Sequence, residues 1–154
     1  MAMTTDIIQE SRDLYGIDDW GAGYFGIGDS GRVEVYPKGK DASVGVSLDR
    51  IMEKALELKA KTPLLIRFPQ ILENQLSSLH KAFQHSIDEY KYEGKLKGVF
   101  PFKVNQRKEF IDTLVECGRK HIYGLEVGTK TELFAALSYD LHPDALFVCN
   151  GFKD

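Results

Sequence analysis

One lysine beside an apolar run is the residue of this sequence best placed to do chemistry. Lys103 follows the run Gly98-Val-Phe-Pro-Phe102 and stands before the polar residues Asn105 and Gln106. Such an approach removes water from one side of the side chain, and desolvation disfavours an ammonium ion, so we expect part of the amine to be neutral. A neutral amine is the nucleophile that forms Schiff bases. Lys103 is therefore the first candidate for a catalytic residue.

Glu126 is the second candidate. It ends a predicted strand in the segment Tyr123-Gly-Leu-Glu-Val-Gly128, and Lys103 ends another predicted strand. Active sites of parallel α/β proteins gather at the C-terminal ends of the strands, so both side chains are expected at one end of the sheet. The alternative for each is a solvated residue at the sheet edge. Asn150-Gly151 ends a further strand at the same rim, where a turn explains it.

A glycine-rich string does not indicate a nucleotide site. Gly26-Ile-Gly-Asp-Ser-Gly31 matches the pattern G-x-G-x-x-G. The dinucleotide-binding version of this pattern follows a strand and opens a helix, whereas here the last glycine leads into Arg32-Val-Glu-Val35, which alternates like a strand. A β-hairpin is the better interpretation, and we expect no bound nucleotide.

The histidines and cysteines show no clear metal spacing. His80 and His85 are five residues apart and fall on different helix faces. Cys117 and His121 have the four-residue step of a helical ligand pair, but Gly118 stands between them and is expected to end the helix. A structural or solvated role is expected for both pairs.

Composition excludes several classes of protein. The 154 residues carry a net charge of −3, with scattered basic residues, so no nucleic-acid footprint is evident. The two cysteines lie far apart, which favours a reduced compartment, and the N-terminus has no basic and apolar segments like those of a signal peptide. No apolar run is long enough to span a membrane. We therefore expect a cytoplasmic protein that binds neither nucleic acid nor membranes.

Periodicity predicts helices and short strands that alternate after an initial hairpin. Residues 1–14 form either a loose arm or a short helix, and Asp29-Ser-Gly31 provides the turn between strands at 24–28 and 32–36. Thr129 and Glu132 have the spacing of a capping box that opens a helix. The remaining predicted elements are helices at 48–60, 70–92, 106–117 and 129–139, and strands at 64–66, 97–103, 122–126 and 145–148.

The alternation indicates parallel strands joined by right-handed crossover helices. The predicted fold class is α/β, the N-terminal part of a TIM-type (β/α)8 barrel preceded by a short β-hairpin region. Three or four parallel strands cannot close an eight-stranded barrel, so the barrel is expected to be incomplete.

Five segments together resemble one enzyme family. They are Tyr15-Gly-Ile-Asp-Asp-Trp-Gly21, Leu64-Leu-Ile-Arg-Phe-Pro69, Phe100-Pro-Phe-Lys-Val-Asn-Gln106, Tyr123-Gly-Leu-Glu-Val-Gly128 and Cys149-Asn-Gly-Phe-Lys-Asp154. In this order and spacing they resemble the N-terminal part of the biosynthetic arginine decarboxylases, which use pyridoxal phosphate (PLP) and have an alanine racemase-like barrel. The resemblance covers nearly the whole chain from Tyr15 onward.

The resemblance implies roles for both candidates. Lys103 matches the lysine that holds PLP as an internal aldimine at the end of the first barrel strand. Glu126 matches an acidic position near that lysine, with a role in orienting Lys103 or balancing its charge. Residues 1–40 would then belong to a β-rich domain, and residues 41–154 to the first strands and helices of the PLP-binding barrel. For full-length members, Mg²⁺ is a further candidate cofactor.

The implied function is that of an N-terminal fragment of an enzyme converting L-arginine to agmatine and CO2 in polyamine biosynthesis. We expect the 154 residues alone to be inactive, because the segments that hold the cofactor phosphate, the pyridine nitrogen and the substrate lie further along in the family. An alternative is a non-catalytic module that binds a partner chain through an open sheet. A lesser alternative is a decarboxylase for another amino acid, such as ornithine or diaminopimelate.

An open parallel sheet has physical consequences. Its edges and both faces are exposed unless helices or partners cover them, so apolar side chains meant for a barrel interior would meet water. We therefore expect a homo-oligomer or a marginally stable chain.

Overall fold

The computed structural model describes residues 2–41 and 44–151, with the side chains of residues 2–5 not described. The chain divides into two compact units, Met1–Ile71 and Leu72–Asp154, and each is considered by itself. The elements of the first unit are α1 (Ala2–Tyr15), α2 (Ile17–Trp20), β1 (Phe25–Ile27), β2 (Val33–Val35), β3 (Val46–Ser47) and α3 (Leu48–Glu57). The second contains most of α4 (Pro69–Glu89), then β4 (Val99–Pro101), the 3₁₀ turn η1 (Phe102–Val104), α5 (Lys108–Gly118), the 3₁₀ turn η2 (Arg119–His121), β5 (Gly124–Val127), α6 (Lys130–Leu137) and β6 (Phe147–Cys149).

The first unit is built on the predicted hairpin. β1 and β2 pair antiparallel, with Phe25 opposite Val35, and Gly31 turns the chain with a φ of 75°. Positive φ is costly for residues with a Cβ, which is why glycine suits this turn. The glycine string is therefore part of a hairpin and does not open a helix. β3, which the sequence did not predict, adds a third antiparallel strand beside β2.

A small apolar core holds the hairpin to the N-terminal helices. Its buried residues are Ile17, Tyr24, Ile27, Val35 and Tyr36. Residues 2–15 form a helix, one of the two alternatives for this region, and the Arg12 guanidinium on it donates to the Ile27 carbonyl over 2.7 Å. α3 lies where a helix was predicted but ends at Glu57, and none of its residues is buried.

The predicted strand at 64–66 is wrong. Residues 64–68 have no regular secondary structure, and their exposure alternates, with Leu64, Ile66 and Phe68 half-buried and Leu65 and Arg67 exposed. This is the period of a strand, but no described segment pairs with it. Without a partner for its N–H and C=O groups, a segment with a strand-like pattern does not become part of a sheet.

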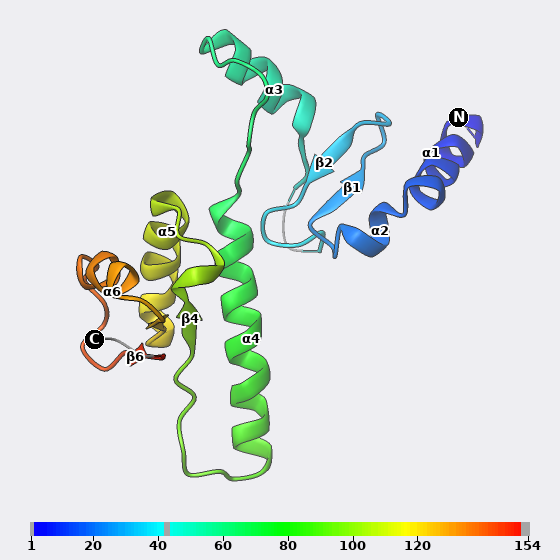
Figure 1. Ribbon diagram of the computed structural model, residues 1–154. Coiled ribbons are helices and arrows are strands. Elements are labelled where there is room, and N and C mark those ends of the chain that lie inside the picture. The colour runs from blue at the N-terminus through cyan, green and yellow to red at the C-terminus, as the bar shows by residue number, and fades with distance from the viewer. Residues whose placement is uncertain (1, 42–43, 152–154) are drawn as a thin grey trace. The chain divides into compact units, whose positions relative to one another are not determined.

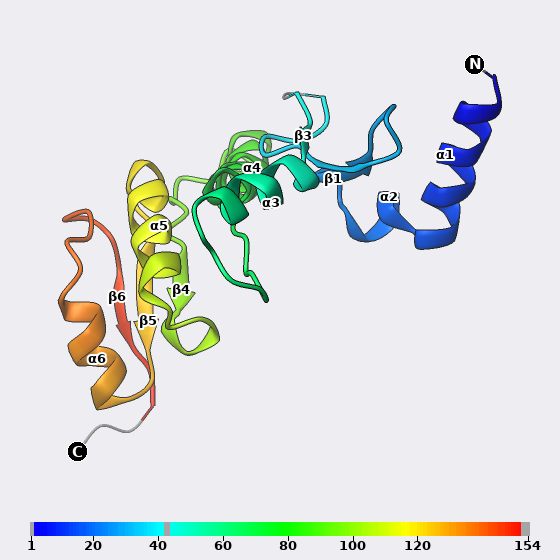
Figure 2. The same ribbon diagram turned by 90° about the horizontal axis from the view of Figure 1, so that it is seen from above.

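The second unit contains a parallel sheet in chain order, β4-β5-β6 (Figure 1 and Figure 2). Phe100 lies opposite Leu125, which lies opposite Phe147. α5 connects the first two strands and α6 the last two, so this part of the predicted α/β alternation is confirmed. Strand boundaries differ: β4 is shorter than predicted at both ends. Pro101 has no N–H to donate, so the hydrogen-bond ladder stops there.

One face of this sheet carries the core. Leu125 and Val127, which point to the same side of β5, are 1% and 0% exposed. They join a cluster of buried residues from the helices and from η1, namely Leu76, Phe102, Ile111, Leu114 and Ala136. The intervening residue Glu126 points to the opposite face and is only half-buried. The helices therefore cover one side of the sheet among the described residues.

Two backbone features shape this unit. A Cβ at Gly124 would collide with the carbonyl oxygen of Leu146, so β5 and the residue before β6 approach each other closely because position 124 has no side chain. α4 ends at Glu89, earlier than predicted, and Lys91 then takes a left-handed conformation with a φ of 51°. A left-handed residue just beyond the last turn is a common way for a helix to end.

No described helix is long and apolar enough to cross a membrane.

Candidate functional site

Lys103 lies in a 3₁₀ turn directly beyond β4. The residue before it, Phe102, is 3% exposed and is part of the core, whereas Lys103 and Val104 are exposed. The expected loss of water around the lysine is therefore wrong for the described chain. The reason is geometric: after Pro101 the backbone turns, which sends Phe102 into the core and leaves Lys103 in solvent. Its amine is accessible to a reagent or cofactor from solution.

Glu126 is the third residue of β5, one position before the strand ends. It lies in register with Pro101 on one side and Val148 on the other, on the sheet face that no described helix covers. Lys103 is two residues beyond Pro101, so the two candidates occupy the same end of the sheet. Among the described residues, no hydrogen bond or ion pair joins them.

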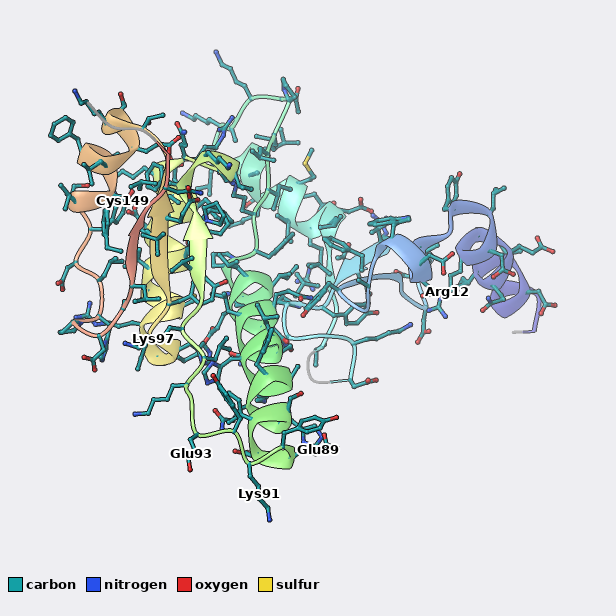
Figure 3. All side chains as sticks on the ribbon, turned by 60° about the horizontal axis from the view of Figure 1, so that its bottom comes forward. Arg12, Glu89, Lys91, Glu93, Lys97 and Cys149 are labelled. Carbon is teal, nitrogen blue, oxygen red and sulfur yellow. The ribbon has the colours of Figure 1, made fainter. Side chains whose placement is uncertain are left out.

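The end of β6 reaches the same rim. The Asn150 N–H donates to the Val127 carbonyl over 2.8 Å, and Gly151 has a φ of 83°. The first bond continues the pairing of β6 with β5, and Gly151 forms a bend; the predicted turn would involve residues beyond those that are described. Cys149, just before it, is exposed at the end of β6 (Figure 3). Phe152, Lys153 and Asp154 lie outside the described residues.

Glu132 is a residue of this rim whose side-chain role was only partly foreseen. As predicted, Thr129 caps α6, because its Oγ1 accepts from the Glu132 N–H over 3.2 Å. In a capping box the glutamate accepts from the N–H of the cap residue. Here Glu132 Oε2 instead accepts from the Gly128 N–H over 2.7 Å, and Oε1 accepts from Gln106 Nε2 over 3.1 Å. The residue as a whole is 8% exposed.

A pair of stacked histidines lies away from this rim. His80 of α4 and His121 of η2 have ring centroids 4.6 Å apart, and His121 Nε2 is 3.2 Å from Ser77 Oγ. Burial lowers the pKa of His121 from its ordinary value, and the neighbouring His80 and Lys120 lower it further. The sequence could not show this pair, because the partners come from separate elements. The structural role expected for these histidines fits the packing of His121.

Cys117 is half-buried, and burial raises the pKa of its thiol, with Glu73 and Glu116 adding to the effect. A thiol of this kind is a poor nucleophile at neutral pH. In the described ranges, no group of three or more histidine, cysteine, aspartate or glutamate side chains is arranged to hold a metal ion. We therefore assign no Mg²⁺ ligand.

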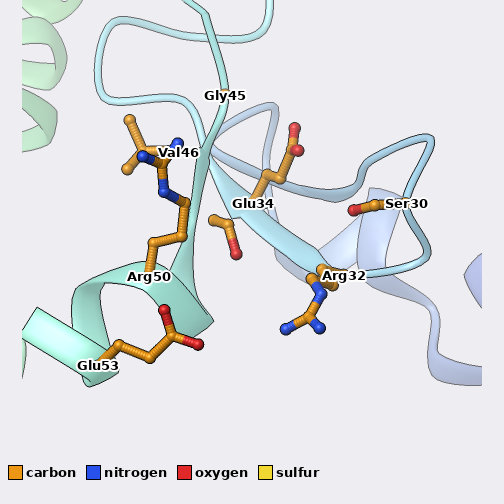
Figure 4. Close-up of a pocket in the computed structure, with 8 residues that line it drawn as sticks. Ser30, Arg32, Glu34, Gly45, Val46, Arg50 and Glu53 are labelled. Atoms are coloured by element: carbon orange, nitrogen blue, oxygen red, sulfur yellow. The ribbon is translucent and has the colours of Figure 1, made fainter.

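The first unit has a hollow of its own, of about 400 Å³, at the start of α3 (Figure 4). Its charged lining residues are Arg32, Glu34, Arg50 and Glu53, so positive and negative groups balance. Arg32 already forms an ion pair with Asp49. The hollow contains neither Lys103 nor Glu126.

Comparison with known proteins identifies relatives of the whole chain. The biosynthetic arginine decarboxylase of Parasynechococcus marenigrum is 47% identical over 150 residues, which are 96% of this chain and 23% of the relative. That of a Prochlorococcus marinus strain is 44% identical over 147 residues, 96% of this chain and 22% of the relative. That of Deinococcus radiodurans is 41% identical over 146 residues, 94% of this chain and 22% of the relative. No family model matches the chain.

A solved structure agrees with these matches. The crystal structure of the biosynthetic arginine decarboxylase of Campylobacter jejuni superposes with a TM-score of 0.81 at 35% identity, covering 91% of this chain and 22% of that one. The chain thus spans a little over a fifth of the length of the relatives that it matches. By sequence and by fold, it is a homologue of the N-terminal portion of biosynthetic arginine decarboxylases.

Proposed function

We propose that this chain is the lysine-bearing N-terminal portion of a PLP-dependent arginine decarboxylase, which converts L-arginine to agmatine and CO2 in polyamine biosynthesis. The match to biosynthetic arginine decarboxylases over 96% of the chain is the observation that supports this most strongly. The activity belongs to the complete enzyme, because the chain spans little more than a fifth of those relatives. A cytoplasmic location, self-association and the assignment of residues 1–40 and 41–154 to a β-rich domain and a barrel are further parts of the proposal.

The residues at the rim of the parallel sheet suit this chemistry. An amine that holds an aldehyde cofactor must be reachable, and Lys103 is exposed. Its backbone must also be fixed, and Phe102 is buried in the core next to it. In the proposal, Lys103 holds PLP through Nζ, and PLP supplies the electron sink for the decarboxylation. Once released from the cofactor, the Lys103 amine can deliver a proton from Nζ to the product.

Glu126 is proposed to orient or balance the charge of Lys103. It comes from the neighbouring strand and lies in register with Pro101, two residues before the lysine. In the complete protein, further segments would cover the face on which Glu126 lies. A carboxylate enclosed there, near an ammonium group, would favour the charged form of the amine.

Cofactor labelling tests the proposal. The protein is incubated with PLP, reduced with borohydride and mapped by peptide mass spectrometry. Selective labelling of Lys103, abolished by Lys103→Arg, is the expected result. Lys81→Arg, which changes an exposed lysine on α4, is the matched control and should leave the labelling intact. Labelling spread evenly over surface lysines and unchanged by Lys103→Arg would contradict the proposal.

The substrate is tested in the longest form of the protein that carries this chain. We expect CO2 release from L-arginine and none from ornithine or diaminopimelate. Faster release from either of the other amino acids would overturn the substrate assignment but leave the role of Lys103 standing.

A second candidate function has its own support. The sheet face with Pro101, Glu126 and Val148 has no cover from described helices, and β4 and β6 are edge strands of the described sheet. Such surfaces are suited to pairing with another chain. If the chain is instead a module that binds a partner decarboxylase subunit, PLP should label none of its lysines selectively. The chain should then co-purify with that subunit.

A further inference from the structure

We propose that Glu132 is the positioning residue of the cofactor lysine: its carboxylate fixes the turn that bears Lys103 against the end of the strand that bears Glu126. The inference rests on the proposed function for the identity of the cofactor. The hydrogen bonds that carry it are a property of this chain alone.

The carboxylate joins two segments that are far apart in sequence. Oε1 accepts from Gln106 Nε2 over 3.1 Å, and Gln106 is three residues beyond Lys103. Oε2 accepts from the Gly128 N–H over 2.7 Å, and Gly128 is two residues beyond Glu126. Each oxygen receives one donor, as suits an ionised carboxylate. A single side chain on α6 thus links both candidate-bearing segments.

Burial of Glu132 strengthens this link. Glu132 is 8% exposed and is the one buried acidic or basic residue found among the described side chains. A buried carboxylate is stable only when it is hydrogen-bonded, so movement of the Gly128 N–H away from it carries a free-energy cost. Gln106 itself is exposed, and its amide provides the second bond to the carboxylate. Bonds to charged groups are also stronger than bonds between neutral groups.

The turn is held on both sides of the lysine. Before it, Phe102 is buried in the core, and its ring lies 6.5 Å from that of Tyr139, just beyond α6. After it, Gln106 donates a hydrogen bond to Glu132 of α6. Lys103 lies between these two anchors and is itself exposed. This arrangement fixes the backbone at Lys103 while leaving the side chain accessible.

Helix capping alone does not explain these bonds. The cap of α6 is made by the Thr129 side chain and the Glu132 backbone N–H, which need no carboxylate. The bond to Gln106 lies outside the helix and adds nothing to its cap. The Glu132 side chain therefore has a separate role, and the two roles can be separated by mutation.

A swap of the two side chains tests this role. Gln106→Glu places a second carboxylate beside Glu132, and the like charges should push the turn away. Adding Glu132→Gln should restore the link, because the new amide at position 132 can donate to the new carboxylate at position 106 while its oxygen still accepts from the Gly128 N–H. Thr129→Ala removes the cap but keeps the carboxylate, so it serves as the matched control.

The readout is the rate of borohydride-trapped PLP labelling at Lys103 relative to Lys81, together with hydrogen exchange of the amides from Lys103 to Gln106. For Gln106→Glu and for Glu132→Ala we expect the labelling ratio to fall on the order of 10- to 100-fold, because small displacements of a reacting group cost this much. The double variant should return to within a few-fold of the starting ratio. Thr129→Ala should leave it unchanged.

The outcomes separate the two proposals. Wild-type labelling by a folded Glu132→Ala variant, or a double variant no better than Gln106→Glu, would overturn the role of Glu132. If Glu132→Ala does not fold, the comparison of Gln106→Glu with the double variant Gln106→Glu/Glu132→Gln tests the role of Glu132 instead. If the unmodified chain labels no lysine selectively, the proposed function fails. Hydrogen exchange in the same variants then still shows whether Glu132 fixes the turn: unchanged exchange in Gln106→Glu would refute it.

Discussion

The helices α3 and α5 look alike in sequence but differ in what they contact. Both carry apolar residues at helical spacing and begin and end near their predicted bounds. α5 buries Ile111 and Leu114 against the parallel sheet, whereas α3 buries none of its residues, and Leu58 just beyond it is 75% exposed. The period of a sequence predicts that a helix has an apolar face. Whether that face has a partner depends on segments elsewhere in the protein.

α4 shows the same contrast within one helix. In its first turns, Leu76 is buried in the core. Further along the same predicted apolar stripe, Leu79, Phe83 and the following Tyr90 are 46%, 49% and 78% exposed. The packed regions should therefore respond to mutation and to pH, while the unpartnered regions should not.

The largest effect is expected from matched truncations in the two helices. Ile111 is fully buried, so Ile111→Ala should cost about 2–5 kcal/mol of unfolding free energy. Ile51 of α3 is half-buried, and Ile51→Ala should cost about 1 kcal/mol. Urea denaturation followed by circular dichroism measures the first. Fluorescence of Trp20, the one tryptophan of the chain, reports on the unit that contains Ile51. Equal costs would show that α3 also has a packed face.

A smaller effect is expected from the helix caps. Thr129 Oγ1 accepts from the Glu132 N–H, so Thr129→Ala should destabilise the chain by about 1 kcal/mol. Ser47 precedes α3 without a side-chain cap bond, and its Oγ is buried without a partner in the described structure. Ser47→Ala should be neutral or slightly stabilising, because it removes an unpaired polar group. A loss of stability in Ser47→Ala would mean that its hydroxyl has a partner in solution.

The smallest effect is expected from pH. The folded chain holds the pKa of His121 below the ordinary 6.5, chiefly through burial. As the pH falls below that value, the unfolded chain takes up the proton more readily than the folded chain. The contribution of His121 to the free energy of unfolding should therefore be complete at neutral pH and decline as the pH falls from about 6.5. His121→Gln should flatten this decline. The control is His85→Gln, since the His85 side chain is 81% exposed. An unchanged decline in His121→Gln would assign the pH dependence to other groups.

The sequence predicted much of the second unit, because its signals are local. The helix of Phe110 and Ile111, the cap at Thr129 and the strand around Leu125 all follow from spacing and turn residues within a few positions. The hairpin turn at Gly31 was predictable for the same reason. These elements also have their partners within the described chain, so local preference and packing agree.

The errors occur where a long-range partner decides the outcome. Leu64, Leu65 and Ile66 have the composition of a strand, but no described strand pairs with them. Lys103 was expected to lose water to its apolar neighbours, yet the turn after Pro101 exposes it. The contact of Gln106 with Glu132 joins residues from separate elements, so no local pattern could predict it.

Gly124 governs how closely β5 approaches the residue before β6, at the end of the sheet opposite the rim. Its contact with Leu146 is between main chains, so no rotamer change could make room for even one added carbon atom. An alanine at this position would have to move the β6 side of the sheet outward, and that displacement would reach Glu126 two residues later. The separation of the two strands where they begin therefore depends on the absence of a side chain, so a glycine that bears no reactive group limits how the strand carrying Glu126 can be placed.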